Sequence, residues 1–348
     1  MEKWCGWFLS RGHEVHMISF TDGKLPGVVF HRIDLGLSGS ESDLAKLKYL
    51  TQGKRIRRLV KDIKPDVVNV HYATSYGAVA ALSGIRGYVL SVWGADVYDF
   101  PRKSPLHRLL LRYSLSRAKL LFSTSRAMAK ETRKYTRKAI KITPFGVDTE
   151  LFTPDKRSRG DDKSFVIGTV KKLEPKYGID VLLKAAAILR EKLPELRIVI
   201  AGNGVNEKEY HQMAEELGLG DIIRWTGFIP QEEAAKLWAD LDAAVIPSVL
   251  ESESFGVAAV EAEASGVPVV ISDVQGLMEA TRPGYTSVVV PRKDPEKLAE
   301  ALLRLAEDEE LRRKLGRNGR RFAVRRYSLD VCFEGIEEKL EEICRERH

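Results

Sequence analysis

The segment PSVLESESFGVAAVEAEASGVP, from Pro247 to Pro268, carries the pattern that decides the predicted fold of this 348-residue chain. An apolar strand is expected just before it, over 243–246, and its Gly- and Ala-rich second half is predicted to be a helix that begins near Ser254. A helix start presents unpaired N–H groups and the positive end of a dipole, which together favour an anion. We expect these N–H groups to belong to Ser254, Phe255, Gly256 and Val257.

Two glutamates stand at this predicted helix start. Glu253 lies in the turn and Glu261 follows eight residues later. A helix beginning at Ser254 places Glu261 about two turns in, roughly 10 Å along the axis, so the two carboxylates can meet two parts of one extended ligand. Glutamates near helix starts also commonly lie at the surface and complement the dipole. The spacing alone therefore leaves both interpretations open.

The residues around the two glutamates favour a ligand site. Pro-Ser precedes Glu253, and Ser-Gly-Val-Pro-Val-Val follows Glu261. This order resembles the signature of the retaining GT-B glycosyltransferases of family 4, the group 1 type, which includes the sucrose synthases. The resemblance implies that Glu253 binds hydroxyls of the transferred sugar and helps to stabilise the cationic centre. It implies that Glu261 accepts hydrogen bonds from the ribose hydroxyls of the donor.

The chain alternates predicted strands and helices throughout, which indicates an α/β fold with parallel sheets and right-handed crossovers. A polar, turn-rich stretch near 154–163 marks the predicted domain boundary. We expect a Rossmann-like acceptor-side domain over 1–155 and a Rossmann-like nucleotide-sugar domain over 156–329. The helix at about 330–348 is expected to pack back on the first domain. The resemblance implies GT-B, two such doubly wound domains facing across a cleft.

The beginning of the chain departs from that family pattern. GT-B domains open with a buried strand and a Gly-rich turn, whereas here a helix over 3–11 is predicted first. The following stretch GHEVHMISF looks like the family's second strand. The first strand of the N-terminal domain is therefore predicted to be missing, and with it the turn that in the family often contacts the sugar phosphate and the acceptor.

A second motif, GTVKKLEPKYGIDVLLKA over 168–185, resembles the family's Gly-Arg-Leu…Lys-Gly element, whose basic side chains hold the donor diphosphate. Lys172 stands at the Arg position and Tyr177 at the Lys position, so both differ from the family pattern. A lysine lacks the bidentate fork of an arginine. We expect Lys176 and Lys171 to supply the missing charge. Lys172, Lys176 and Glu253 are the predicted catalytic residues, and Lys171 is a predicted donor ligand.

Two glycine turns complete the predicted donor side. AGNGVNEKE, over 201–209, lacks the third glycine of a dinucleotide fingerprint. It fits the family's donor-side Gly-x-Gly turn and makes Gly202 a candidate ligand. WTGFIP, over 225–230, resembles the turn whose backbone at Gly227 and Ile229 lies beside the nucleotide base. A purely structural turn remains an equal alternative for this second segment.

On the acceptor side, SVWGADVYD over 91–99 resembles the family's His-Gly-x-Asp turn. Trp93 replaces the histidine, which removes an imidazole and keeps an aromatic face that can stack on a sugar ring. Asp96 and His71, at the end of the predicted strand 66–70, are the polar acceptor-side candidates. A single histidine at a strand end is often structural, so both roles stay open for His71.

Composition narrows the class of protein. A hydrophobic content of 44% and a charged content of 30% fit a globular protein, and no apolar run approaches the length of a membrane span. No signal peptide is recognised. Three scattered cysteines fit reduced thiols, which favours a cytoplasmic location, with peripheral attachment to the inner face of the membrane.

Positive charge is concentrated in the first half. Residues 1–157 hold 28 Lys and Arg against 14 Asp and Glu, and residues 102–141 hold thirteen basic residues against the single acid Glu131. Such asymmetry predicts an anionic partner, and we favour an anionic membrane surface. Nucleic acid is not expected, because no aromatic stacking platform accompanies the charge. A solvated surface is the plain alternative.

No metal site is expected. Asp240-Leu-Asp242 has the spacing of a metal motif found in another glycosyltransferase fold, but here it spans the end of a helix and the start of a strand. His13-Glu-Val-His16 has the wrong spacing for a zinc-protease helix. The only expected small-molecule partners are a nucleotide diphosphate sugar, as co-substrate, and an acceptor.

The function predicted from these motifs is retaining, metal-independent transfer of a sugar from a nucleotide diphosphate sugar to a glycan or lipid-linked acceptor. In the family's favoured front-face mechanism a leaving phosphate oxygen takes the acceptor proton, so no separate base is named. The alternative is a catalytically impaired nucleotide-sugar-binding protein, which the missing strand, Tyr177 and Trp93 favour. A polyanion-binding protein is the third and less favoured class.

Overall fold

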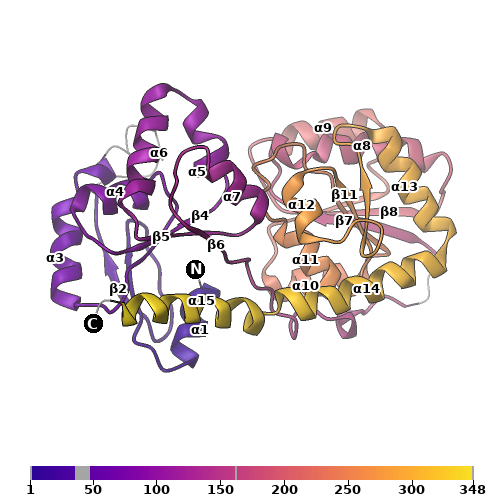
Figure 1. The fold of residues 1–348 in the computed structure, drawn as a ribbon. Helices are drawn as coiled ribbons and strands as arrows, with labels where there is room; N and C mark the ends of the chain where they lie inside the picture. The colour runs from indigo at the N-terminus through magenta and orange to yellow at the C-terminus, as the bar shows by residue number, and fades with distance from the viewer. Residues whose placement is uncertain (1, 36–47, 161–162, 347–348) are drawn as a thin grey trace. The chain divides into compact units, whose positions relative to one another are not determined.

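The computed structural model describes residues 2–35, 48–160 and 163–346. The chain divides into two compact units. Unit 1 comprises Met1–Thr124, Met128–Thr143 and Phe333–His348, and unit 2 comprises Ser125–Ala127 and Pro144–Cys332. Each unit is built on parallel strands joined by helices (Figure 1). The predicted pair of doubly wound α/β domains is confirmed.

Unit 1 opens with a helix that is followed by two parallel strands. A second parallel sheet has the strand order β3-β4-β5-β6. The strand bounds are β1 (His16–Ser19), β2 (Val29–Arg32), β3 (Asn69–His71), β4 (Val89–Val92), β5 (Leu120–Ser123) and β6 (Ile140–Ile142). The helices are α1 (Glu2–Ser10), α3 (Gly53–Ile63), α4 (Tyr76–Ser83), α5 (Ala95–Tyr98), α6 (Pro105–Arg117) and α7 (Arg126–Thr132), with a 3-10 turn η1 (Phe100–Arg102).

The core of unit 1 lies between its strands and its helices. Strand β4 is buried along its whole length, which is why its sequence is nearly continuous apolar rather than alternating. Leu111 and Leu115 from α6 and Met128 from α7 are fully buried in the same cluster. Helix α4 packs against both α3 and α6.

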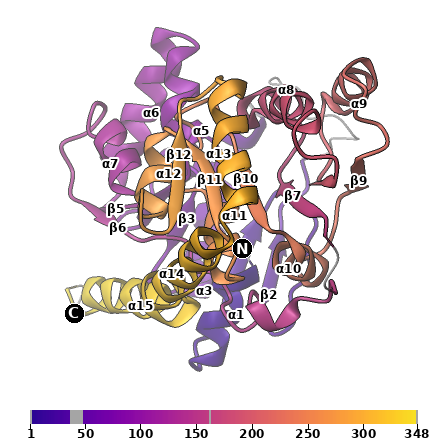
Figure 2. The same ribbon diagram turned by 90° about the vertical axis from the view of Figure 1, so that its right-hand side faces the viewer.

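Unit 2 contains a parallel sheet with the strand order β12-β11-β10-β7-β8-β9. Figures 1 and 2 show α8 and α13 on one face of this sheet and α10 and α11 on the other. The strands are β7 (Phe165–Val170), β8 (Leu196–Ala201), β9 (Ile223–Gly227), β10 (Ala243–Ile246), β11 (Val269–Ser272) and β12 (Ser287–Val290). The helices are α8 (Ile179–Arg190), α9 (Glu207–Glu216), α10 (Gln231–Asp240), α11 (Val257–Ala264), α12 (Gln275–Ala280), α13 (Pro295–Glu307) and α14 (Glu309–Tyr327), with 3-10 turns η2 (Pro154–Lys156) and η3 (Pro175–Tyr177).

The strand order of unit 2 reverses between β7 and β10. From β7 the chain adds β8 and β9 on one side, and then returns to add β10, β11 and β12 on the other. In doubly wound sheets ligands bind at the carboxyl ends of the strands at such a switch point. The loops that follow β7 and β10 are the two segments singled out in the sequence.

The last helix, α15 (Leu329–Arg345), begins directly after Ser328 and its residues from Phe333 onward belong to unit 1. The Phe333 ring lies 5.3 Å from Trp4 and 5.8 Å from Trp7, measured between ring centroids. Glu337 accepts hydrogen bonds from Arg11 at 3.2 Å and pairs with His13 at 2.7 Å. These contacts tie α15 to α1.

Several boundaries differ from the sequence-based expectation. The sequence over 42–63 predicts one helix with basic residues along it, but α3 spans only Gly53–Ile63, and residues 42–47 lie outside the described residues. The short helices α5, α7 and α12 were not predicted, because four to seven residues give too few turns for a periodic pattern. Helix α11 begins at Val257 rather than near Ser254, which is a correction that changes the site.

Candidate functional site

The loops after β7 and β10 touch through their backbones. A Cβ added at Gly178, which has a φ of +68°, would lie 2.0 Å from the carbonyl oxygen of Pro247. The N–H of Val249 donates to the carbonyl of Lys176 at 2.8 Å. Only glycine fits at residue 178, since any side chain would displace the other loop. The lysine-rich loop and the glutamate-bearing loop are therefore held side by side.

Lys171 and Glu253 form an ion pair between these two loops. The Lys171 ammonium lies 2.8 Å from a carboxylate oxygen of Glu253, and each side chain is 11% exposed. The two residues are far apart in sequence, and only the adjacency of β7 and β10 brings them together. Lys171 therefore lies closest to Glu253 of the three candidate lysines, although the sequence placed Lys172 and Lys176 ahead of it.

Tyr177 organises two of the lysines. Its ring lies beneath the Lys171 ammonium at 4.9 Å and the Lys176 ammonium at 4.6 Å, both measured to the ring centroid. Burial raises the pKa of its hydroxyl, so the phenol stays protonated at neutral pH. The Lys172 ammonium lies 3.8 Å from a carboxylate oxygen of Glu174. Because 71% of the Lys172 side chain is exposed, an incoming anion can reach its ammonium. The tyrosine at the family's lysine position thus holds neighbouring ammonium groups on its face.

The start of α11 lies next to this pair along the chain. Gly256 caps the helix in a left-handed conformation with φ 80°, and Val257 is the first helical residue. Glu261 is therefore only about one turn, or about 6 Å, into the helix, not two. Phe255 is buried and packs edge-on against Phe145 and Tyr327, so its side chain serves the core. The first N–H groups of the helix have no acceptor within it.

Glu263 is a further position of interest on α11 that no sequence motif indicated. It is fully buried and packs against Gly319 of α14. Burial raises the pKa of its carboxyl to about 8, and the Thr286 hydroxyl lowers it only in part. The group is therefore neutral at pH 7. It lies two residues from Glu261, on a different side of the helix, so it belongs to the packing of α11 and not to the candidate ligand face.

The two glycine turns predicted for the donor side lie next to each other. The N–H of Gly202 donates to the carbonyl of Gly227 at 2.7 Å, which joins the carboxyl ends of β8 and β9. Two large apolar side chains are exposed beside them, Val205 at 88% and Phe228 at 77%. Ile229 is half-buried. Two exposed apolar side chains at the ends of strands can pack against the flat face of an aromatic or sugar ring.

In unit 1, Asp96 has a defined structural task. Its carboxylate is fully buried and accepts hydrogen bonds from the backbone N–H groups of Ala73, Trp93 and Gly94, at 2.9, 3.0 and 2.9 Å. It fixes the turn after β4 to the turn after β3. The geometry therefore supports positioning by Asp96, in place of the direct acceptor contact that the sequence suggested.

His71 and Trp93 lie together within unit 1. The imidazole of His71 packs edge-on against Trp4 at 4.8 Å and against Trp93 at 5.6 Å between ring centroids. Burial lowers the pKa of His71 to about 3, which keeps the ring neutral. Its Nδ1 is buried without a hydrogen-bond partner in the part of the chain that the structure describes. The neutral imidazole of His71 is therefore a polar group packed between the aromatic rings of Trp4 and Trp93.

Known protein families match most of the chain. Residues 153–322 match the family described as Glycosyl transferases group 1, and residues 1–125 match the family described as Glycosyl transferase 4-like. The first match contains both Glu253 and Glu261 and all three candidate lysines. The chain belongs to the group 1 glycosyltransferases. It is a nucleotide-sugar glycosyltransferase, as the sequence predicted.

The similarity of this glycosyltransferase to named relatives extends over both units. It is 29% identical over 325 residues to D-inositol 3-phosphate glycosyltransferase of Kribbella flavida, which covers 84% of this chain and 76% of the relative. It is 27% identical over 341 residues to the putative glycosyltransferase EpsD of Bacillus subtilis, which covers 92% of this chain and 87% of the relative.

Solved structures establish the fold of this glycosyltransferase as GT-B. Sucrose-phosphate synthase from Thermosynechococcus elongatus superposes with a TM-score of 0.84 at 20% identity, covering 97% of this chain and 90% of the other. Anabaena HepE in complex with UDP and glucose superposes with a TM-score of 0.77 at 20% identity, covering 98% and 95%. At these identities the likeness concerns the fold alone.

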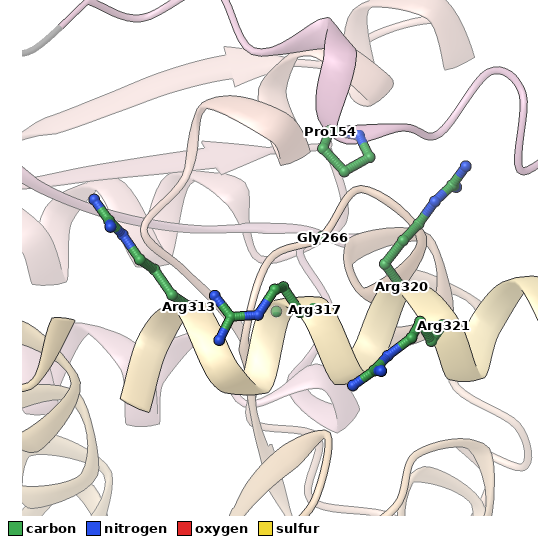
Figure 3. Close-up of a pocket in the computed structure, with 7 residues that line it drawn as sticks. Pro154, Gly266, Arg313, Arg317, Arg320 and Arg321 are labelled. Atoms are coloured by element: carbon green, nitrogen blue, oxygen red, sulfur yellow. The ribbon is translucent and has the colours of Figure 1, made fainter. Parts of the chain in front are cut away.

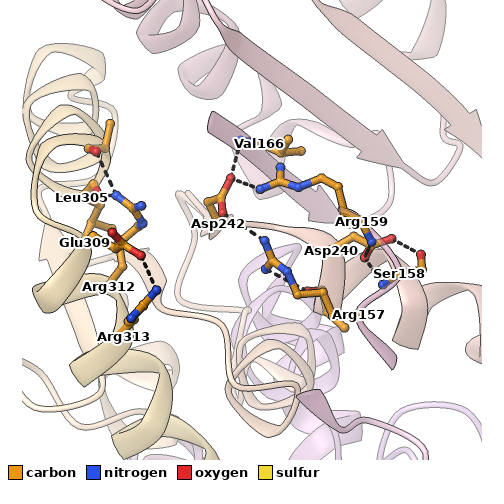
Figure 4. Close-up of polar contacts among 12 residues, drawn as sticks. Arg157, Ser158, Arg159, Val166, Asp240, Asp242, Leu305, Glu309, Arg312 and Arg313 are labelled. Atoms are coloured by element: carbon orange, nitrogen blue, oxygen red, sulfur yellow. Dashed lines mark hydrogen bonds and ion pairs between the residues drawn. The ribbon is translucent and has the colours of Figure 1, made fainter. Parts of the chain in front are cut away.

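The Asp-x-Asp motif of this glycosyltransferase has structural partners (Figure 4). Asp240 accepts hydrogen bonds from the N–H groups of Ser158 and Arg159, at 2.6 and 2.8 Å. Asp242 accepts from the Arg159 guanidinium at 2.6 Å and from the N–H of Val166 at 2.9 Å. Both carboxylates thus anchor the segment that leads into β7.

Within the described residues 2–35, 48–160 and 163–346, no three His, Cys, Asp or Glu side chains gather in a way that could hold a metal ion. Within the same residues no helix has the length and apolar character needed to cross a membrane.

Proposed function

We propose that this enzyme transfers a sugar, with retention of anomeric configuration and without a metal, from a nucleotide diphosphate sugar to a glycan or lipid-linked acceptor. The observation that carries the proposal is the ion pair of Lys171 and Glu253 at the switch point of the unit 2 sheet, beside the start of α11. We assign donor binding to residues 156–329 and acceptor binding to residues 1–155.

The charges of this site match the demands of the reaction. Breaking the bond between the anomeric carbon and the diphosphate oxygen leaves a cationic sugar and an added negative charge on the diphosphate. Lys172, Lys176 and the N–H groups at the start of α11 are preorganised to meet that negative charge, and such donors contribute about 3–4 kcal/mol each. No metal is then required for charge neutralisation.

The two glutamates divide the donor between them. Glu253 bonds the hydroxyls of the transferred sugar and stabilises the cationic centre, while Lys171 holds its carboxylate in place. Glu261, one turn into α11, accepts from the ribose hydroxyls. The turns at Gly202 and Gly227, with Ile229 and Phe228, flank the base. The leaving phosphate oxygen takes the proton of the acceptor hydroxyl, so the proton moves on the same face as the new bond.

The exposed side chains of helix α6 favour an acceptor that is bound to a membrane. The helix exposes the apolar side chains of Leu106, Leu109 and Tyr113, at 72%, 63% and 40%, beside Arg108 and Arg112. Exposed apolar residues among cations are typical of helices that lie in an anionic membrane interface. We therefore also propose peripheral attachment to an anionic membrane, on its cytoplasmic face, through residues 102–141.

One activity measurement tests the proposal. Release of nucleotide diphosphate from a panel of sugar nucleotides is followed for the unmodified chain and for Glu253→Gln, with and without EDTA. We expect turnover that is insensitive to EDTA and falls at least a hundredfold in the variant. Full activity of Glu253→Gln contradicts the role of Glu253, and loss of activity with EDTA contradicts the metal-free mechanism.

A catalytically impaired nucleotide-sugar-binding protein is the second candidate. It is favoured by Tyr177 at the family's lysine position and by Trp93 at its histidine position. It predicts that calorimetry detects binding of a sugar nucleotide while no donor in the panel is turned over. Turnover of any donor at a rate that depends on Glu253 rejects it.

A further inference from the structure

Helix α14 carries a group of arginines around a hollow that the proposed reaction does not use. The hollow has a volume of about 510 Å³ and is lined by Pro154, Gly266, Gly316, Arg313, Arg317, Arg320 and Arg321. In Figure 3, Arg313 and Arg320 extend to the same side of α14 as Pro154, and Arg317 lies between them along the helix. All the lining residues belong to unit 2.

Arg317, in the middle of this group, has only basic residues as its neighbours one turn away along the helix. The positions three and four residues away from Arg317 are Arg313, Lys314, Arg320 and Arg321. These are the positions that contact a residue on a helix, and like charges there are destabilising. Within residues 2–35, 48–160 and 163–346, Arg317 makes no ion pair or side-chain hydrogen bond and is exposed.

The neighbouring arginines are held in place by other groups. Arg320 donates to the main-chain carbonyls of Thr149, Phe152 and Ala264, at 2.9, 2.8 and 2.9 Å, so neutral oxygens fix it. Arg321 donates to the side-chain oxygen of Asn318 at 2.6 Å, which is also neutral. These two guanidinium charges are thus oriented without a direct ion pair.

Acidic groups offset part of this charge. Glu309 pairs with Arg313 at 2.5 Å, and Glu150 and Asp155 act on Arg320 from a greater distance. The charges of Arg317 and Arg321 remain unmatched by any direct ion pair in the described part of the chain. The hollow is therefore a site of excess positive charge beside oriented guanidinium groups.

The chemistry of the hollow points to a phosphate. Every basic side chain lining it is an arginine, whose planar fork binds phosphate oxygens in pairs, whereas Lys314 on the same helix does not line it. Gly316 lets α14 lie against the Gly266 backbone, since a Cβ at residue 316 would lie 2.1 Å from the Gly266 carbonyl oxygen. Pro154 and the arginine stems make the lining apolar. A volume of about 510 Å³ is ample for a phosphate ester with a small organic part.

We propose that the hollow around Arg317 binds a phosphate monoester at a site separate from the sugar-transfer site. The phosphate oxygens bond Arg317 and Arg321, and the organic part lies over Pro154. The same chemistry is offered by a soluble phosphorylated metabolite and by the monoester headgroup of phosphatidic acid in a membrane. The proposal does not depend on the transfer reaction, because none of these residues belongs to the loops after β7 and β10 that carry the proposed donor site.

Calorimetric titration of the full chain with glycerol 3-phosphate tests the site. The variants are Arg317→Gln and, as a matched control with the same loss of charge on the same helix, Lys314→Gln. We expect affinity to fall about tenfold or more in Arg317→Gln, as removal of a charge-assisted hydrogen bond requires, and to change less than twofold in Lys314→Gln. Lys172→Gln, at the proposed donor site, keeps the binding.

Two results overturn the proposal: equal losses in Arg317→Gln and Lys314→Gln, which reveal only diffuse surface charge, or no binding by the unmodified chain. Sedimentation with vesicles that contain phosphatidic acid, whose headgroup is a phosphate monoester, against phosphatidylcholine vesicles, separates the two sources of phosphate. Vesicle binding that Arg317→Gln weakens more than Lys314→Gln assigns the lipid headgroup. Binding of glycerol 3-phosphate without such an effect on vesicles assigns a soluble ester.

Discussion

The ammonium group of Lys171 and the carboxylate of Glu253 lie 2.8 Å apart in unit 2, with 11% of each side chain exposed. A pair that is this shielded from water is costly to break, since the remaining charge loses its partner and regains little solvent. Glu253 therefore depends on Lys171 for its fixed position. The pair links the sugar end of the proposed donor site to the loop that carries the lysines.

Replacing Lys171 by Met is expected to lower the free energy of unfolding by about 2–4 kcal/mol, because it leaves the Glu253 carboxylate without its partner. Urea unfolding at pH 7 measures this change. In the double variant Lys171→Met/Glu253→Gln most of the loss should be recovered, since no unpaired charge remains. Additive losses in the double variant would mean that the two side chains do not depend on each other.

Tyr177 is expected to act through its ring and not through its hydroxyl. Tyr177→Phe keeps the aromatic face under Lys171 and Lys176, so kcat/KM for sugar transfer should stay within about twofold. Tyr177→Ala removes both cation–π contacts, each worth about 0.5–2 kcal/mol, and should lower kcat/KM about tenfold. Steady-state kinetics of the two variants decide between the ring and the hydroxyl. A loss in Tyr177→Phe equal to that in Tyr177→Ala would assign the function to the hydroxyl.

Glu263 is expected to make the protein less stable as the pH rises. Its pKa is raised to about 8 in the folded state, from an ordinary value of 4.5. Between these values the folded state keeps a proton that the unfolded state has released, so the free energy of unfolding falls with pH, by about 1.4 kcal/mol per pH unit. Below pH 4.5 both states are protonated and the full stability is present.

The variant Glu263→Met removes that proton linkage. Urea unfolding at pH 5, 6, 7 and 8 should show a weaker decline of stability for Glu263→Met than for the unmodified chain, and a gain in stability at pH 8. Glu307→Gln, at an exposed glutamate of α13, is the control and should leave the slope unchanged. Parallel stability curves for the unmodified chain and Glu263→Met would refute the linkage.

The exposed leucines of α6 are expected to control membrane attachment. Leu106→Ser/Leu109→Ser should reduce co-sedimentation with phosphatidylglycerol vesicles at least tenfold, because burying each leucine in lipid contributes about 1.5–3 kcal/mol. Leu82→Ser, at an exposed leucine of α4, is the control. Unchanged vesicle binding in the α6 variant would leave only the basic side chains to attract the membrane.

The fold could be predicted because buried parallel strands have continuous apolar sequences. The strand Ala243–Ile246, for example, has the bounds that its sequence predicted. The start of α11 could not be placed, since Ser254 reads as an N-cap while the capping residue is Gly256 in a left-handed conformation. The polar residues before it favour a turn and a helix start almost equally.

Sequence patterns could not predict which residues the candidate site residues contact. The pairing of Lys171 with Glu253 depends on β7 and β10 being neighbours in the sheet, which no local pattern records. Asp96 matched a family motif, but its hydrogen bonds to three N–H groups required the fold of two turns. The burial of Glu263 could not be predicted, because a glutamate in an Ala-rich helix is normally expected on the exposed face.

The contact of Gly178 with the Pro247 carbonyl joins the loops after β7 and β10, which form the proposed donor site, without any side chain. This contact and the hydrogen bond from the N–H of Val249 to the carbonyl of Lys176 hold the two loops together as one rigid unit. Main-chain atoms alone therefore set the distance between the two loops. Variation of the side chains can therefore retune which sugar is accepted while the spacing between the two ends of the donor stays constant.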